Sequence, residues 1–226
     1  MNVKFGHLEY DFRLLRKDLV LVEASSQYAI TSMFLRPQEF YESPYPSIHA
    51  QYFELDEYID IYARDKGKFS YYTDWSGFNI PSTSFKKFIE VFQYSFSAKE
   101  HILVNGIRSL IPNLDEARFY IISVIKNNVD RSTLNHEIAH ALWYLDENYC
   151  VKMQILVDDI PTKVHTPIVR RLRKCGYAEK VMDDEIQAYL ATSPSIKIRS
   201  LFHLPKSYKI PCGFKKTFLE YCGSNK

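Results

Sequence analysis

The chain has 226 residues, of which 46% are hydrophobic and 15% aromatic. This composition can bury a core for one domain, or for a domain with two lobes, and it excludes an intrinsically disordered chain. The formal net charge of +2 argues neither for nor against a nucleic-acid partner. From Lys163 onward, however, the chain has 13 basic residues and only 5 acidic ones. We therefore expect a basic lobe at the C-terminal end.

Neither a membrane segment nor a secretory signal is recognisable. Residues 1–10 lack the apolar run that a Sec signal peptide requires, and the longest apolar stretches, such as 119–125, are far shorter than the roughly 20 residues that span a bilayer. We expect a soluble protein with no membrane span that is cytoplasmic, or exported by a route without a Sec signal peptide.

The first 80 residues are rich in tyrosine and phenylalanine, and their role cannot be deduced from the sequence. Pro37, Pro44 and Pro46 interrupt them, and this pattern predicts short strands and loops. With no repeat and no Gly/Ser linker, we expect one compact unit, in which residues 1–110 form an aromatic-rich N-terminal part and residues 111–226 form a catalytic part that includes the basic lobe.

Two helices are predicted before residue 111. The spacing of aromatic residues predicts an amphipathic helix over 84–96. Ser97 and Glu100 form a capping-box pattern, which predicts a second helix that ends at about Leu110. A β-branched and aromatic run at 119–125 then predicts a strand.

The segment from His136 to His140 is the most informative part of the chain. It reads His-Glu-Ile-Ala-His, an HExxH pattern, in a stretch with one apolar helical stripe formed by Leu134, Ile138, Leu142 and Leu145. Residues four apart share a helix face, so His136 and His140 can bind one metal ion, and Glu137 can reach a water molecule at that ion. Zinc lowers the pKa of such a water, and Glu137 is the candidate general base for its attack on a carbonyl group.

A catalytic zinc ion needs a third protein ligand, and the sequence offers three candidates. Glu185 lies in a predicted helix beside small residues that allow close packing, and it is favoured. Asp146 follows His140 by six residues, but residues 141–145 are predicted to continue the helix past the metal. His165 is expected in a proline-flanked loop.

The aspartates next to Glu185 and two tyrosines complete the predicted site. Asp183 and Asp184 are expected to be solvated residues of the first helical turn, stabilised by the helix dipole, and the less favoured alternative is that they support the motif histidines from behind. Tyr189, Tyr177 and His165 are candidates to stabilise the negative charge of a transition state.

The segments Asn135–Leu142 and Asp184–Tyr189 together resemble the gluzincin group of zinc metallopeptidases, whose third ligand is a glutamate on a later helix. The resemblance covers about a quarter of the chain. It implies that His136, His140 and Glu185 are metal ligands, that Glu137 is the general base, and that a peptide or protein is the substrate. The long interval between the motifs, and the absence of asparagine before the glutamate, leave the subfamily unassigned.

We therefore expect an α+β, zincin-like metallopeptidase domain that binds Zn²⁺, with a small mixed sheet ahead of the motif helix and a helical C-terminal lobe. The alternative is a non-enzymatic, zinc-stabilised binding module whose basic lobe docks an acidic partner or nucleic acid. This alternative is less favoured, because a structural zinc site does not need a base such as Glu137. Nucleic acid, which belongs to the alternative, is therefore the less favoured partner.

Overall fold

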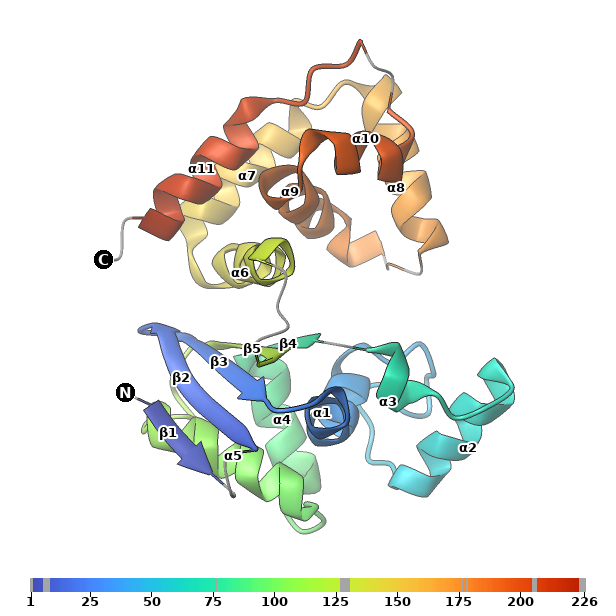
Figure 1. Ribbon diagram of the computed structural model, residues 1–226, viewed down its shortest axis with the longest axis vertical. Helices are drawn as coiled ribbons and strands as arrows, with labels where there is room; N and C mark the ends of the chain where they lie inside the picture. Colours follow the sequence, from blue (N-terminus) through green and yellow to red (C-terminus); the bar gives the residue numbers. More distant parts are fainter. Residues whose placement is uncertain are drawn as a thin grey trace. The chain divides into compact units, whose positions relative to one another are not determined.

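The protein has an α+β architecture with a small mixed sheet and many helices (Figure 1). The computed structural model describes residues 2–5, 9–75, 77–126, 131–175, 177, 179–204 and 207–223. The chain divides into two units, Met1–Val129 and Asp130–Lys226, and each is described by itself. Among the described residues, none of the helices has the length and apolar character needed to cross a membrane.

The N-terminal unit is a sheet with helices packed against it. The strand order is β1-β2-β3-β5-β4, in which β3 and β5 are parallel and the other neighbouring pairs are antiparallel. Helices α1, α4 and α5 pack against the strands (Figure 1). The elements of this unit are β1 (Asn2–Phe5), β2 (Tyr10–Arg16), β3 (Leu19–Ala24), α1 (Gln27–Glu42), α2 (Leu55–Lys66), α3 (Tyr71–Asp74), β4 (Gly77–Pro81), α4 (Ser82–Phe92), α5 (Ala98–Leu110) and β5 (Tyr120–Ile125).

The prediction of short strands and loops for the first 80 residues was wrong where the structure has the helices α1 and α2. Pro37 lies inside α1, although proline in a helix interior costs about 3 kcal/mol. Apolar residues of α1 such as Met33, Phe34 and Phe40 are buried in the core, and their burial outweighs that cost. Tertiary packing thus overrides the local signal of the proline.

The elements predicted between residues 82 and 125 were confirmed, although the first helix begins at Ser82 and ends at Phe92 instead of residue 96. Helix α4 corresponds to the helix expected over 84–96, and strand β5 to the run at 119–125. The capping box of α5 is complete, because Glu100 Nα donates to the Ser97 hydroxyl and Ser97 Nα donates to the Glu100 carboxylate. Glu100 also forms a buried ion pair with Arg36 of α1, which connects the two helices.

Strand β5 lies within residues 111–226, the range expected for the catalytic part. It pairs with β3 and β4, however, and therefore belongs to the N-terminal unit. The described part of the C-terminal unit is helical. Its apolar core includes Leu142 of α6, Met153 of α7 and Ile186 of α9. Its elements are α6 (Arg131–Leu145), α7 (Glu147–Asp158), α8 (Thr162–Lys174), the 3₁₀ turn η1 (Glu179–Val181), α9 (Met182–Thr192), α10 (Ser195–Phe202) and α11 (Cys212–Gly223).

A close contact between α5 and β2 generates a stability prediction. A Cβ atom added at Gly106 would lie only 2.5 Å from the ring of Phe12, which is fully buried. We expect Gly106→Ala to lower the free energy of unfolding by about 1–3 kcal/mol, because the ring must move within a filled core. Urea denaturation measures this change. Asn105→Ala, at an exposed position of the same helix, is the matched control and should shift stability by less than about 0.5 kcal/mol; equal midpoints for the two variants would contradict the overpacking argument.

Candidate metal centre

Helix α6 carries both motif histidines on one face. Its residues Ala139 and Leu142 are buried in the core of the C-terminal unit, which fixes the rotation of the helix about its axis. His136 and His140 are one turn apart, and their Nε2 atoms lie 3.1 Å from each other. His140 is buried and His136 is half-buried. The expectation that four-residue spacing would bring the two imidazoles together was confirmed.

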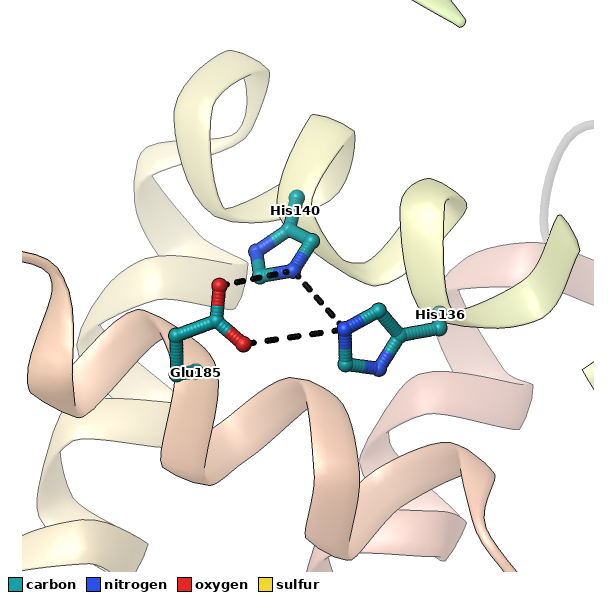
Figure 2. A group of neighbouring side chains, drawn as sticks. All are labelled: His136, His140 and Glu185. Atoms are coloured by element: carbon teal, nitrogen blue, oxygen red, sulfur yellow. Dashed lines mark hydrogen bonds and ion pairs between the residues drawn. The ribbon is translucent and has the colours of Figure 1, made fainter. Parts of the chain in front are cut away.

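Helix α9 packs against α6 and supplies the carboxylate. Met182, Ile186 and Leu190 of α9 are buried, and the small residue Ala188 is fully buried in the same core. Glu185 is directed toward the two histidines (Figure 2). Its Oε1 atom lies 3.5 Å from Nε2 of His140, and its Oε2 atom lies 3.7 Å from Nε2 of His136.

His136, His140 and Glu185 can therefore hold a metal ion, since their donor atoms all lie within 4.8 Å of one another. Tetrahedral ligands at about 2.0–2.1 Å from zinc are about 3.4 Å apart, which falls among the observed separations of 3.1, 3.5 and 3.7 Å. Oε2 of Glu185 is buried and has no hydrogen-bond partner among the residues that the structure describes. A buried carboxylate oxygen without a partner is costly, and a cation at this position would satisfy it.

Asp184 contacts the other nitrogen of His140, which corrects the expectation that it is a solvated first-turn residue. Its Oδ1 atom lies 2.9 Å from Nδ1 of His140. A carboxylate only accepts hydrogen bonds, so Nδ1 carries the proton and donates, and in the neutral imidazole the lone pair remains on Nε2, toward Glu185. The solvated reading failed because the first turn of α9 faces α6.

The electrostatic field at the centre favours a cation. Burial lowers the pKa of His140, but the carboxylates of Asp184, Glu185 and Glu137 outweigh burial and raise that pKa to about 10. The same negative charges that retain a proton on His140 also attract a divalent metal ion, which must displace the proton before Nε2 can bind it.

Glu137 belongs to the same group of side chains. It is half-buried on α6, and its charge is among the causes that raise the pKa values of His140, Tyr177 and Tyr189. Glu137 directly follows His136 on the helix that carries both histidines.

The two tyrosines named as transition-state donors lie together at the centre. The ring of Tyr189 is 4.6 Å from the ring of His136, and the hydroxyl groups of Tyr189 and Tyr177 are 3.4 Å apart. Burial is the main cause that raises the pKa values of both phenols, so both keep their protons at neutral pH and can donate.

The other two candidate third ligands have different positions. Asp146 follows the last residue of α6 and caps α7, where its carboxylate accepts a hydrogen bond from Tyr149 Nα at 3.1 Å. His165 is not in a loop but within α8, where it lines a surface pocket of about 690 Å³ with Arg170, Arg173 and Lys174. Neither belongs to the group of converging donor atoms found among the described residues.

Of the polar side chains that support the centre, sequence reasoning gave Asp184 only as a less favoured partner of the histidines and missed Gln187 and Tyr149. The position of Asp184 directly before Glu185 was a usable signal, because it lies on the same helical turn. Gln187 and Tyr149 had no local signal. Comparisons with protein-family models, with curated proteins and with solved structures found no match to this chain.

The geometry separates the two acidic candidates for third ligand. We expect Glu185→Ala to weaken the binding of a divalent ion by at least tenfold to a hundredfold, because even the loss of residues that only support ligands reaches that scale. Titration of the metal-free protein with Zn²⁺ against a chromophoric chelator measures the affinity. Asp146→Ala, the matched control, should keep the affinity and lower stability by about 0.5–2 kcal/mol through loss of the α7 cap. The opposite pattern of metal loss would assign the ligand to Asp146.

Proposed function

We propose that this protein is a zinc-dependent metallopeptidase that hydrolyses peptide bonds. The observation that carries the proposal is the convergence of His136, His140 and Glu185 on one point, with Glu137 one residue from the first ligand on the same helix. A ligand set without a neighbouring base would suit a structural metal site equally well. The presence of Glu137 favours hydrolysis.

The donor set supports zinc as the metal. Two imidazole nitrogens and one carboxylate are a typical ligand set of catalytic zinc, which keeps a fourth position open for water or substrate. Ions such as Mg²⁺ and Ca²⁺ instead prefer ligand sets made only of oxygen atoms. The arrangement also resembles the gluzincin pattern, in which two histidines of one helix and a glutamate of a later helix bind the ion. We extend the proposal to a zincin-like domain made of the small mixed sheet and the helical C-terminal lobe.

In the proposed reaction, zinc would supply Lewis acidity toward the peptide carbonyl and toward the attacking water. The carboxylate of Glu137 accepts a proton from this water as its oxygen forms a bond to the carbonyl carbon. The same carboxyl group then donates that proton to the amine nitrogen while the C–N bond breaks. His136, His140 and Glu185 hold their positions through both steps, and Asp184 keeps the proton of His140 on Nδ1.

The two tyrosines have a role in this scheme as hydrogen-bond donors. A tetrahedral intermediate carries negative charge on the former carbonyl oxygen, and donors already in place stabilise it without reorganisation. Tyr177 and Tyr189 share a hydroxyl–hydroxyl contact of 3.4 Å, so one phenol orients the other. We assign the pair to this role and not to a proton transfer, because burial keeps their pKa values high.

A second function is favoured by one observation, the basic pocket on α8. Arg170, Arg173 and Lys174 line it together with His165, and the acids Glu179 and Asp183 line it as well. An acidic partner or a nucleic acid could dock on the basic side chains while the metal only stabilises the unit. Arg173, however, already forms a bidentate ion pair with Glu179. Salt-sensitive binding of nucleic acid by the metal-free protein would favour this function over hydrolysis.

The main test of the proposal separates metal binding from chemistry. We expect Glu137→Gln to retain about one zinc ion per chain by elemental analysis and to lose at least about a hundredfold in turnover, because an amide keeps the shape but cannot accept a proton. Cleavage of a mixed synthetic peptide library, followed by mass spectrometry, measures turnover. Wild-type protein that contains no zinc after remetallation, or a variant that cleaves within tenfold of the wild-type rate, would refute the assignment.

The tyrosine pair generates a separate kinetic prediction. We expect Tyr177→Phe and Tyr189→Phe each to lower kcat by about a hundredfold while the KM changes little, because the lost hydroxyl acts mainly on the transition state. Steady-state kinetics on one peptide identified from the library measures both constants. Tyr208→Phe is the matched control, since the Tyr208 hydroxyl is buried in the same unit and has no hydrogen-bond partner in the described part of the chain. Wild-type kcat in both test variants would exclude the tyrosines from the reaction.

A further inference from the structure

A line of hydrogen bonds, partly exposed at Asp184 and buried at Gln187 and Tyr149, extends from the candidate metal centre to helix α7. Oδ1 of Asp184, which contacts His140 at 2.9 Å, also accepts a hydrogen bond of 2.9 Å from Nε2 of Gln187. Oε1 of Gln187 accepts a hydrogen bond of 2.8 Å from the hydroxyl group of Tyr149. Three helices thus contribute to the line: α6 through His140, α9 through Asp184 and Gln187, and α7 through Tyr149.

The direction of each hydrogen bond follows from the chemistry of the groups at its ends. Asp184 as a carboxylate can only accept, so the amide of Gln187 must turn its NH₂ group toward Asp184 and its oxygen toward Tyr149. Burial raises the pKa of Tyr149, so its phenol stays protonated and donates to that oxygen. Only one orientation of the amide therefore satisfies both neighbours.

Burial makes any other orientation of the Gln187 amide costly. Gln187 and Tyr149 both have 0% exposure, so water cannot replace either partner. A buried amide that loses a partner is left unsatisfied, at a cost larger than the net value of the hydrogen bond. The line of hydrogen bonds therefore restrains the Asp184 carboxylate, and Asp184 in turn restrains the ring orientation and the tautomer of His140.

We propose that Gln187 is a positioning residue of the metal centre and that the Tyr149 hydroxyl group sets its orientation, an inference that rests on the proposed metal site. Through Asp184 the two residues keep the lone pair of His140 Nε2 directed at the metal position. Neither residue touches the metal or the substrate. Their contribution is to the affinity for the ion, because a ligand that is already oriented loses less freedom when it binds.

The test compares Zn²⁺ affinity in single and double variants of the full chain. Tyr149→Phe removes one hydroxyl group, and Gln187→Met keeps the length of the side chain but removes both hydrogen bonds. We expect Tyr149→Phe to weaken Zn²⁺ binding by about threefold to tenfold and Gln187→Met by at least about tenfold, measured by competition with a chromophoric chelator. If the residues act in series, Tyr149→Phe has no further effect in the Gln187→Met background.

The absorption spectrum of the Co²⁺-substituted protein is the readout that a merely structural role would not move. A changed ligand-field band in Tyr149→Phe, at an unchanged melting temperature of the metal-free protein, supports positioning. Tyr208→Phe is the matched control and should keep wild-type affinity and spectrum. Affinity within twofold of the wild type for Tyr149→Phe, or fully additive effects in the double variant, would overturn the inference while the metal site stands. Wild-type protein that binds no Zn²⁺ would overturn the metal site as well.

Discussion

A carboxylate buried between two helices needs positive charge beside it, and much of the C-terminal unit is arranged around that need. Glu185 projects from α9 toward α6, where it lies against the imidazoles of His136 and His140 (Figure 2). Without a cation, a proton on His140 must compensate the charge, and Oε2 of Glu185 still has no hydrogen-bond partner within the described ranges. With a metal ion, both problems are solved at once. The cost of buried charge alone favours a cation at this position, independently of any family resemblance.

Two glutamates of the N-terminal unit show how differently the same cost can be met. Glu100 is also buried, but both of its oxygens accept hydrogen bonds from the Arg36 guanidinium, and one also accepts a hydrogen bond from the backbone at the start of α5. For Glu39, burial raises the pKa and favours the neutral acid. Glu185 instead lies against the imidazoles of two histidines. The contrast within one chain distinguishes a ligand from a structural acid.

The spacing of the HExxH motif predicted the geometry of His136 and His140, because four residues on a helix determine a shared face whatever the rest of the fold. Glu185 was also predictable, because its apolar neighbours identify the helix face that packs. Asp184 was misjudged, since an acid in a first helical turn has the same local pattern whether it faces water or another helix. Pro37 misled for the opposite reason: its local signal is strong, but burial of the α1 core overrides it. Contacts between distant segments, such as Tyr149 with Gln187, leave no trace in local periodicity.

A single residue, Asp146, separates α6 from α7, and it caps the second helix while the first ends. The orientation of α7 relative to α6 therefore depends on the number of residues at this junction. One residue added within the first turn of α7 would turn the rest of the helix by about 100° and move it by about 1.5 Å. Tyr149 would then point away from Gln187, and the centre would lose its outermost support although every ligand remained. Related chains built on this plan should vary freely in the identity of exposed residues near position 146, but hardly at all in the number of residues between His140 and Tyr149.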